Sequence, residues 1–584
     1  MSTQGPNRAC EPSVLWRCPL LSYSDAKTRF VFVTGGVLSG IGKGATTASI
    51  ARLFQFRGLG IRIVKIDPYL NIDPGTLNPI EHGEVFVTDE TWTFHPVDES
   101  EFMITEVDLD FGTYERFTGL DVHPSQNITS GQIYTSVILG ERKGSFLGKT
   151  VQIIPHVTEQ IKKRIWENVR KVPQPDVLLV EIGGTVGDIE AAPFLEAVRQ
   201  LAMEVGRDRV AFVHVTYIPY VSAVGEFKTK PTQHSVRTLQ GLGLQPDIII
   251  CRAEKRLDAS ARAKIALFCN VPEERVISNP DISVIYRLPL SFEEQGLGEV
   301  LVKHLHLEER RPESESWKRV VESFENATET VTIAMPGKYT TLSDSYKSIN
   351  EALAHAAASE GAKVIVKWIE TEVRCDEQCL AEDLRDVDGV LLTPGFGERG
   401  VEGMIGAASV SFENMIPFLG ICYGAQLGTV AFARKRMGWK GANTTEVDPD
   451  SLYPVVDLMD EQRGAKNKGG TMRLGGHEVR LVEGTRLHAI YGETVTRERF
   501  RHRYHLIERY IRKMKDKGLI IAAYDNTGTI INAVELTDHP FWIGVQYHPE
   551  FKSRPGKPHP LYLGLIKAAL QYKKLRGKTV ASQP

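Results

Sequence analysis

The chain has 584 residues, of which 42% are hydrophobic and 24% charged, and its formal net charge is −3. This length predicts at least two domains, each able to bury its own core. The near-neutral balance, without a basic block, gives no support to a nucleic-acid partner. No apolar stretch approaches the ~18–20 residues of a membrane helix, and the N-terminus lacks a signal-peptide pattern. Seven scattered cysteines indicate reduced thiols, so we expect a cytoplasmic protein with no membrane partner.

The first half of the chain has the pattern of a doubly wound α/β domain, which we place at residues 29–307 after an N-terminal extension at 1–28. A glycine-rich stretch and a helix at 45–57 separate the first two strands, as in a βαβ unit. A further helix is expected at 193–204. The buried strands are expected at 29–34, 61–66, 177–181, 210–215 and 248–251.

A charged, proline-broken segment from residue 308 to residue 316 marks the boundary, and we place a linker at 308–330. A second doubly wound domain is expected at 331–572, followed by a polar, disordered tail at 573–584. Its first buried strands are expected at 331–335, 364–369, 390–392 and 416–421.

The second half contains a cysteine with the surroundings of an enzymatic nucleophile. In Gly420-Ile421-Cys422-Tyr423-Gly424 the cysteine follows an apolar strand and lies between glycines. Such glycines permit the sharp strand-to-helix turn of a nucleophile elbow, where the helix N-terminus stabilises a thiolate. Far downstream, His548-Pro-Glu550 supplies a base and a carboxylate to orient it. A buried cysteine between packing glycines is the alternative for the first segment alone. Together the segments resemble the class I glutamine amidotransferase domain.

A second segment has the context of a phosphate-binding loop. Residues 35–44 are Gly-Gly-Val-Leu-Ser-Gly-Ile-Gly-Lys-Gly, between a predicted strand and a predicted helix. Backbone N–H groups, the helix dipole and Lys43 suit an anion there. The glycine spacing is one residue longer than in a strict P-loop, and Gly44 stands where a magnesium-binding Ser or Thr is usual. A purely structural turn is the alternative.

Without that hydroxyl, magnesium would need carboxylates from elsewhere, because it takes oxygen ligands and bridges phosphates. Glu181 ends a predicted strand, where open α/β sheets bind ligands, and Asp110 lies in an acidic segment. Either acid alone could be a solvated or capping carboxylate. Residues 225–234 place two lysines on an apparent loop, for which a solvated basic loop is the alternative.

Several long strings make the resemblance specific. They begin at Phe32 (Phe-Val-Thr-Gly-Gly-Val-Leu-Ser), Lys65 (Lys-Ile-Asp-Pro-Tyr-Leu-Asn-Ile-Asp-Pro-Gly), His82 (His-Gly-Glu-Val-Phe-Val), Glu181 (Glu-Ile-Gly-Gly-Thr-Val-Gly-Asp-Ile-Glu) and Lys228 (Lys-Thr-Lys-Pro-Thr-Gln-His-Ser-Val). In this order, ahead of a Cys/His/Glu amidotransferase domain, they resemble the CTP synthase family over roughly residues 29–572. The resemblance implies an ATP-dependent amidoligase joined to a glutaminase, which converts UTP, ATP and L-glutamine to CTP, ADP, phosphate and glutamate.

The resemblance also implies roles for individual residues. The catalytic residues are Cys422, His548, Glu550, Lys43 and Lys65. The ATP-binding residues are Gly40, Ile41, Gly42, Lys43, Gly44, Ala45, Asp110 and, on the adenine side, Asp281. The residues for UTP and CTP are Ser39, Asp188, Ile189, Glu190, Lys228, Thr229, Lys230, Pro231, Thr232, Gln233 and Lys264. The glutamine-binding residues are Gly395, Tyr423, Gly424, Ala425, Gln426, Glu446 and Arg503, and the magnesium ligands are Asp110 and Glu181.

By the same resemblance, ATP phosphorylates O4 of the uracil ring and ammonia displaces the phosphate at C4. Free ammonia would be protonated or lost in bulk water, so a protected internal path between the sites is expected. The family is also activated by GTP, inhibited by CTP and homotetrameric, and it could form filaments.

The sequence departs from the family pattern in four places. Pro394 stands where the first glycine of Gly-Gly-Phe-Gly is expected, so it has no N–H to offer an oxyanion, and Gly395 and Tyr423 would have to supply the amides. Gly40 replaces a common serine. Residues 89–105 form an insertion, and residues 1–28 are extra.

Rival interpretations differ in which segments they leave unexplained. Another ATP-dependent glutamine amidoligase should lack the string at 228–233. A non-catalytic polymerising scaffold would tolerate loss of Cys422 or Lys43, yet both are present. A γ-glutamyl hydrolase would use only the second domain and leave the first 300 or so residues without a role.

Overall fold

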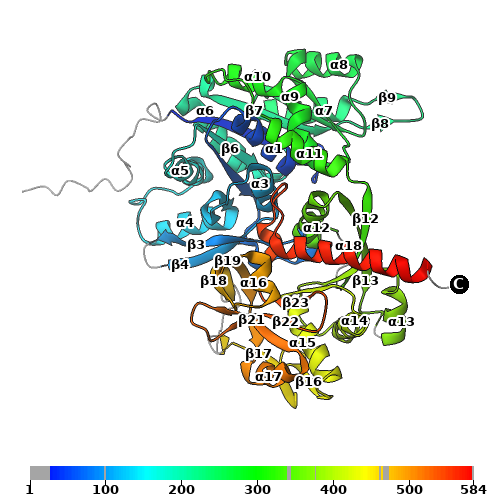
Figure 1. Cartoon of the computed structure of the whole chain (residues 1–584). Helices are drawn as coiled ribbons and strands as arrows, with labels where there is room; N and C mark the ends of the chain where they lie inside the picture. Colours follow the sequence, from blue (N-terminus) through cyan, green and yellow to red (C-terminus); the bar gives the residue numbers. More distant parts are fainter. Residues whose placement is uncertain are drawn as a thin grey trace, which may run out of the picture.

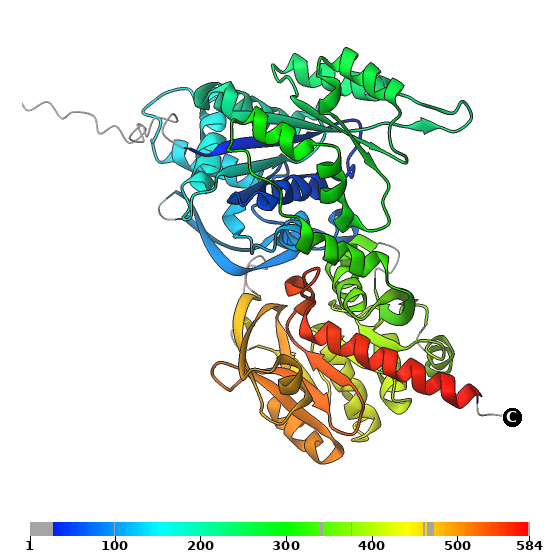
Figure 2. The ribbon, with the colours of Figure 1, turned by 45° about the horizontal axis from the view of Figure 1, so that its top comes forward.

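The structure is a computed structural model that describes residues 27–97, 100–338, 343–374, 376–459, 462–463 and 472–581. Two α/β domains lie one above the other in Figure 1, and Figure 2 shows them from a second direction. The hairpin of β3 (Phe86–Val97) and β4 (Ser100–Val107) and the helix α12 (Lys347–Ser359) lie at the boundary between the domains in both views. The expected α/β fold class is confirmed, and the strands and helices predicted for both domains begin and end within two residues of the observed ones.

The first domain is built on a parallel sheet with central strand β1. In spatial order its strands are β11 (Val276–Pro280), β10 (Ile248–Ala253), β7 (Val210–Tyr217), β1 (Arg29–Gly35), β6 (Val177–Ile182), β2 (Ile61–Asp67) and β5 (Asn127–Thr129). Phe30 and Phe32 pack into the core on one face, whereas Val31 and Val33 pack into the core on the other. Helices therefore cover both faces, which is why these strands are apolar at almost every position.

The helices of this domain lie between its strands and after the last of them. They are α1 (Lys43–Phe56), α2 (Pro79–His82), α3 (Asp110–Thr118), α4 (Ser130–Arg142), α5 (Thr158–Val169), α6 (Ala192–Val205), α7 (Lys230–Gly241), α8 (Ala259–Cys269), α9 (Leu288–Glu294) and α10 (Leu297–His304). Because the loops after β1, β2 and β6 all leave the carboxyl edge of the sheet, they bring residues from distant parts of the chain together.

The second domain has a mixed sheet, parallel from β13 to β23 and antiparallel beyond. Its strands in spatial order are β13 (Ala362–Glu370), β12 (Glu329–Gly337), β14 (Gly389–Leu392), β15 (Phe418–Ile421), β23 (Trp542–Val545), β22 (Ile531–Leu536), β21 (Leu519–Asp525), β18 (Arg473–Leu481) and β19 (Val495–His502). A small separate sheet joins β16 (Ala442–Thr444), β17 (Tyr453–Leu458) and β20 (Tyr504–Leu506). The helices are α12 (Lys347–Ser359), α13 (Glu377–Asp383), α14 (Val401–Glu413), α15 (Tyr423–Lys435), α16 (Arg486–Tyr491), α17 (Glu508–Met514) and α18 (Pro560–Ala581).

Two hairpins extend from the first domain. Strands β8 (Tyr220–Val221) and β9 (Glu226–Phe227) form a short one. The predicted insertion lies in the longer one, formed by β3 (Phe86–Val97) and β4 (Ser100–Val107). Figure 1 shows this longer hairpin beside β18 and β19 of the second domain. The Arg497 side chain on β19 donates to the Asp89 carbonyl on β3, so the insertion contacts both domains.

A helix lies at each end of the second domain. Within the predicted linker, α11 (Glu315–Glu325) buries Trp317, whose indole N–H donates to the Tyr286 carbonyl at 2.8 Å. The expected disordered tail from residue 573 is wrong as far as Ala581, because α18 continues to that residue. The polar side chains hold the helix to its domain: Lys573 donates to the Thr330 carbonyl, and Arg576 pairs with Asp388 at 2.7 Å. Residues 1–26 and 582–584 of the predicted termini lie outside the described residues.

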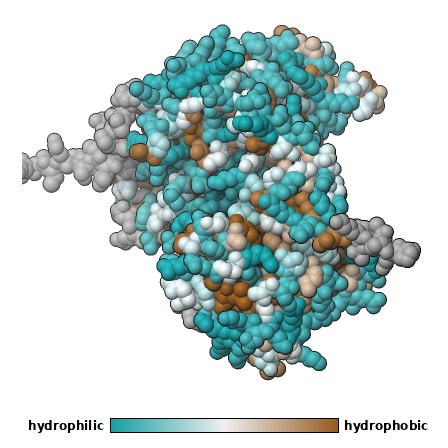
Figure 3. Space-filling view, in the orientation of Figure 1, coloured by the Kyte–Doolittle hydropathy of each residue, from teal (hydrophilic) through white to brown (hydrophobic). Residues whose placement is uncertain are grey.

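The face of the molecule drawn in Figure 3 is mostly hydrophilic, as expected for a chain in which 24% of the residues are charged. Apolar side chains on the same face form small groups over both domains (Figure 3). Over the residues that the structure describes, no helix combines the length and apolarity that crossing a membrane would require.

Candidate functional site

Cys422 lies at the junction of β15 and α15. Its backbone has φ 51° and ψ −104°, a conformation that costs a non-glycine residue about 1–3 kcal/mol. The turn depends on its glycine neighbours: a Cβ at Gly424 would lie 2.1 Å from the Leu392 carbonyl oxygen. The Cys422 amide donates to the Val545 carbonyl at 2.7 Å, which ties the elbow to β23. The predicted nucleophile elbow is thus present as a strained, tightly packed turn.

His548 and Glu550 follow β23, next to the elbow. The His548 ring pairs through Nδ1 with a Glu550 carboxylate oxygen at 2.7 Å, and both side chains are buried. Burial alone would lower the pKa of His548, but Glu550 and the Cys422 thiol outweigh it and raise that pKa to about 10. A cationic imidazole favours an adjacent thiolate. This arrangement can generate a thiolate and orient the base beside it.

These residues open into a cavity of about 740 Å³ that both domains line. Gly75, Thr76, Glu84 and Val85 of the first domain line it together with Cys422. The expected glutamine residues that line it are Gly395, Tyr423, Gln426, Glu446 and Arg503. Within the part of the chain that the structure describes, the carboxamide oxygen of Gln426 is buried without a hydrogen-bond partner. A buried acceptor without a partner is costly, so this oxygen is suited to a bound polar ligand.

Two charges in the cavity match the two ends of an α-amino acid. Glu446 accepts from the Gly397 amide at 2.8 Å, and burial raises its pKa. Arg503 donates to the Gln462 side chain at 2.9 Å. A carboxylate suits an ammonium group and a guanidinium suits a carboxylate, and both line the cavity that holds the cysteine.

The loop 393–397, which carries Pro394, is held by a lysine that the sequence analysis did not identify. Lys338, the residue after β12, donates to the carbonyls of Phe396 and Gly397, both at 2.7 Å. The Tyr423 hydroxyl donates to the same Gly397 carbonyl at 2.8 Å. Burial lowers the pKa of Lys338 to about 8. The conformation of this loop therefore depends on Lys338 and Tyr423, which lie outside it.

In the first domain, the glycine-rich loop after β1 leads into α1 with Gly40 and Gly42 at positive φ (71° and 84°). Lys43 is the first residue of α1 and donates to the Gly184 carbonyl at 2.6 Å. Burial lowers the pKa of Lys43, although Glu181 acts in the opposite direction. A Cβ on Gly44 would lie 2.3 Å from an Asp110 oxygen. The carboxylate of Asp110 thus occupies the space that a Ser or Thr side chain would fill.

The acidic residues around this loop outnumber its lysines. Lys65 lies 2.5 Å from carboxylate oxygens of both Asp108 and Asp110. Burial alone would lower the pKa of Lys65, but these two acids outweigh it, and the pKa lies well above its usual value. Glu181 accepts from the Tyr114 hydroxyl at 2.6 Å. Burial, with a further contribution from Asp110, raises the pKa of Glu181.

This donor set fits a divalent cation. A cation near Asp110 and Glu181 would relieve the repulsion that raises the pKa of Glu181. Across the described part of the chain, no group of three or more His, Cys, Asp or Glu side chains forms a complete metal site. Magnesium commonly takes one or two carboxylates and fills its other positions with phosphate oxygens and water.

Comparisons with known proteins agree with this two-domain organisation. A family model described as CTP synthase N-terminus matches residues 29–307, and one described as glutamine amidotransferase class-I matches residues 341–568. The CTP synthase of Methanopyrus kandleri is 50% identical over 93% of this chain and 99% of its own length. The chain belongs to the CTP synthase family.

Other members of the family match over similar lengths. The CTP synthase of Pyrococcus furiosus is 49% identical over 94% of this chain and 100% of its own. The CTP synthase of Caldanaerobacter subterraneus subsp. tengcongensis is 46% identical over 93% of this chain and 99% of its own. A solved structure of the Trypanosoma brucei CTPS glutaminase domain with bound acivicin is 32% identical, with a TM-score of 0.38, and covers 41% of this chain and 94% of its own.

The residues that the family resemblance implies for UTP and CTP lie mostly at the surface. Ser39, Asp188, Ile189, Glu190 and Lys264 are exposed. Lys228 pairs with Glu226 at the end of the short hairpin, and Lys230 begins α7, so the apparent basic loop is in part a helix. Within the described residues, no hydrogen bond or ion pair joins Asp188 or Glu190 to these lysines.

The remaining predicted nucleotide contacts are either packed or paired. Thr229, Thr232 and Gln233 are buried around the start of α7, and Pro231 is half-buried there. Ile41 is buried and Ala45 is half-buried around the start of α1. Asp281 forms an ion pair with Arg252 at 2.5 Å. The structure thus brings the glutaminase residues together in one cavity, whereas the predicted nucleotide residues form separate groups.

Proposed function

We propose that the protein makes CTP from UTP, ATP and glutamine, or from UTP, ATP and ammonia. The observation that carries this proposal is the cavity lined by both domains, which opens the Cys422 site toward the amidoligase domain. The cytoplasm is the compartment that we propose for it. Another glutamine amidoligase is not favoured, because the relatives reported above match almost the whole chain.

In the glutaminase step, the Cys422 thiolate attacks the glutamine carboxamide and a tetrahedral intermediate forms. His548 holds the proton that the departing ammonia takes, and Glu550 keeps the imidazole in place through its bond to Nδ1. Glu446 and Arg503 bind the ammonium and carboxylate groups of the substrate. Water then releases glutamate from the thioester.

Because Pro394 has no N–H, we propose that the oxyanion accepts from the backbone amides of Gly395 and Tyr423. Both residues line the cavity beside Cys422, and preorganised amides of this kind stabilise developing negative charge. Gly424 and Ala425, which the family resemblance also assigns to glutamine binding, follow Tyr423 in α15 and are buried.

In the amidoligase step, the loop 40–45 cradles the ATP phosphates with its amides, and Lys43 and Lys65 stabilise charge on the phosphoryl group that moves to O4 of UTP. Asp110 and Glu181 would hold Mg²⁺, which supplies charge neutralisation between phosphate oxygens when bound. Asp281 would lie on the adenine side. The exposed sets at 188–190 and 228–233, with Ser39 and Lys264, would bind UTP.

The family resemblance further supports GTP as an activator, CTP as an inhibitor, a homotetramer and, in some conditions, filaments. CTP and UTP carry the same ribose and triphosphate, so we propose that CTP competes through partly shared contacts. Ammonia would pass from Cys422 through the cavity lined by Glu84 and Val85 to the amidoligase domain.

The proposal is tested by following CTP by chromatography and the absorbance change of the uracil ring, with UTP, ATP and magnesium present. We expect CTP with either ammonium chloride or glutamine, and no CTP when ATP is omitted. Glutamate release without CTP under every condition would support a hydrolase instead. Absence of both products would support a scaffold.

A further inference from the structure

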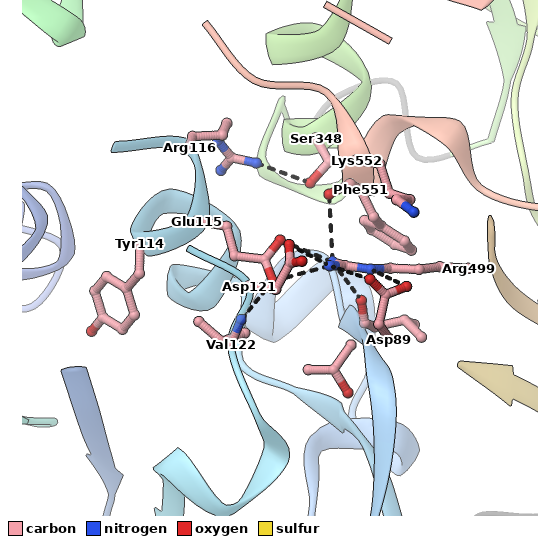
Figure 4. Close-up of polar contacts among 12 residues, drawn as sticks. Asp89, Tyr114, Glu115, Arg116, Asp121, Val122, Ser348, Arg499, Phe551 and Lys552 are labelled. Carbon is pink, nitrogen blue, oxygen red and sulfur yellow. Dashed lines mark hydrogen bonds and ion pairs between the residues drawn. The ribbon is translucent and has the colours of Figure 1, made fainter. Parts of the chain in front are cut away.

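A buried ion pair between the two domains joins Arg499 of β19 to Glu115 of α3. The two side chains are fully buried, with 0% exposed. Arg499 Nη1 and Nη2 donate to the two carboxylate oxygens of Glu115 at 2.9 and 3.1 Å. Figure 4 shows the guanidinium at the centre of a set of acceptors from both domains. A bidentate pair of this kind fixes direction as well as distance.

The side chain of Arg499 has further partners in the insertion hairpin. It donates to the Val87 carbonyl at 3.0 Å and lies 3.3 Å from the Asp89 carboxylate. Burial alone would raise the pKa of Asp89, but Arg499 outweighs it and holds that pKa below its usual value. Arg554 also pairs with Glu115. The guanidinium therefore holds α3 and the base of β3 against the second domain.

The backbone of Arg499 holds the glutaminase base. Its carbonyl accepts from the His548 amide at 2.8 Å. Its Nη1 also donates to the Phe551 carbonyl at 3.4 Å, and the Phe551 ring stacks on the His548 ring with 5.4 Å between centroids. Displacement of the guanidinium would thus shift His548 through two contacts, the backbone hydrogen bond of Arg499 and the ring of Phe551.

On the other side, Glu115 lies on the helix that organises the phosphoryl-transfer site. Helix α3 begins at Asp110, the proposed magnesium ligand, and its Tyr114 hydroxyl donates to Glu181. Glu115 also accepts from the Val122 amide at 2.9 Å, which holds the chain after α3. One ion pair therefore connects the helix of one active site with the base of the other.

We propose that Arg499 is a positioning residue that couples glutamine hydrolysis to phosphoryl transfer, by linking His548 to α3 through Glu115. This inference rests on the proposed function. Occupation of the site at Asp110 and Glu181 sets the position of α3. Through its ion pair with Glu115, Arg499 then moves with α3 and changes the position of His548. Without the pair, glutamine is hydrolysed out of step with formation of the phosphorylated uracil intermediate.

The test compares Arg499→Lys with Arg497→Ala. The first keeps a positive charge but cannot bind Glu115 bidentately. The second is a matched control on the same strand, because Arg497 is exposed and its side chain donates to the Asp89 carbonyl in the hairpin. For each variant we would measure glutamate released per CTP formed, the effect of ATP plus UTP on the glutaminase rate, and ammonium-dependent CTP synthesis.

For Arg499→Lys we expect ammonium-dependent synthesis within about twofold of the wild type. The stimulation of glutaminase by the nucleotides should fall roughly 5- to 150-fold, the range of a typical coupling between sites. The glutamate-to-CTP ratio should rise. Arg497→Ala should keep the wild-type ratio.

Glu115→Gln and the double variant, which combines Arg499→Lys with Glu115→Gln, provide a second test if one variant folds poorly. If the pair acts as a unit, the nucleotides should stimulate glutaminase in the double variant no less than in either single variant. A wild-type glutamate-to-CTP ratio in Arg499→Lys would overturn the proposal, as would an equal loss of glutamine- and ammonium-dependent synthesis. A wild-type protein that makes no CTP from either nitrogen source would instead contradict the proposed function.

Discussion

The fold positions the functional groups of the glutaminase site more completely than those of the amidoligase site. The first has a strained elbow, a histidine already held by its carboxylate, and a cavity around both. The second has crowded buried acids beside two lysines, and its predicted UTP residues are largely exposed. The protein fold alone thus organises the nucleophile, whereas the crowded buried acids at the proposed phosphoryl-transfer site carry negative charge that a bound divalent cation would balance.

Cys422→Ala gives the sharpest separation of the two sites. Only the thiolate can form the thioester, so glutamine-dependent CTP formation should fall by at least ~10³-fold. Ammonium-dependent synthesis should persist, because the amidoligase residues lie in the other domain. Steady-state rates with each nitrogen source check this. An equal loss of both activities would contradict the division of labour.

Asp110→Ala and Glu181→Ala should have the opposite pattern. Each removes a carboxylate from the proposed metal site, so synthesis should fall roughly 10²- to 10³-fold with glutamine and with ammonium alike. Basal glutaminase activity, measured without nucleotides, provides the internal control. Near-normal ammonium-dependent turnover in either variant would remove that residue from the metal site.

Glu550→Gln tests the electrostatics of the glutaminase site. Because the pKa of His548 is raised to about 10 in the fold, the stability that its protonation contributes is complete below the usual pKa of about 6.5. It is lost as the pH rises through about 10. Removing the Glu550 charge leaves burial dominant, so the folded pKa should fall.

We therefore expect the alkaline limb of the glutaminase profile to move to lower pH in Glu550→Gln, with a rate loss of about 10²-fold at neutral pH. The ammonium-dependent reaction, compared at equal free NH₃, should keep its profile. An unchanged alkaline limb would show that Glu550 does not set the protonation of His548.

Lys228→Ala and Glu190→Ala should have the smallest effects. Lys228 is 46% exposed and already paired with Glu226, so its loss should raise the UTP Michaelis constant and the CTP inhibition constant by roughly 3- to 10-fold. Glu190→Ala should relieve CTP inhibition with little change for UTP. If Lys228→Ala leaves both constants unchanged, the basic segment is only a solvated surface.

The sequence predicted the sites best where neighbouring residues define the geometry. Glycines at 420 and 424 dictate the elbow at Cys422, and His548 and Glu550 are two residues apart. Gly44 indicated that a carboxylate would replace a hydroxyl, and Asp110 takes that space. Apolar strands likewise indicated the central strands of both sheets.

Contacts between distant residues were not predictable in the same way. Arg499 and Glu115 are 384 positions apart, and neither lies in a distinctive local pattern. Lys338 similarly acts on a loop 58 residues away. The helix after residue 573 was missed because its polar side chains suggested disorder, whereas Lys573 and Arg576 bind carbonyl and carboxylate groups of their own domain.

The central claim is that nitrogen released at Cys422 reaches the amidoligase site inside the protein. The most direct measurement supplies amide-¹⁵N-glutamine together with unlabelled ammonium at a concentration too low to support synthesis alone, and determines the ¹⁵N content of the CTP amino group by mass spectrometry. If the nitrogen is transferred inside the protein, the CTP should be labelled almost completely from the first turnovers. Labelling that follows the ¹⁵N fraction of ammonia in the bulk solution would contradict it.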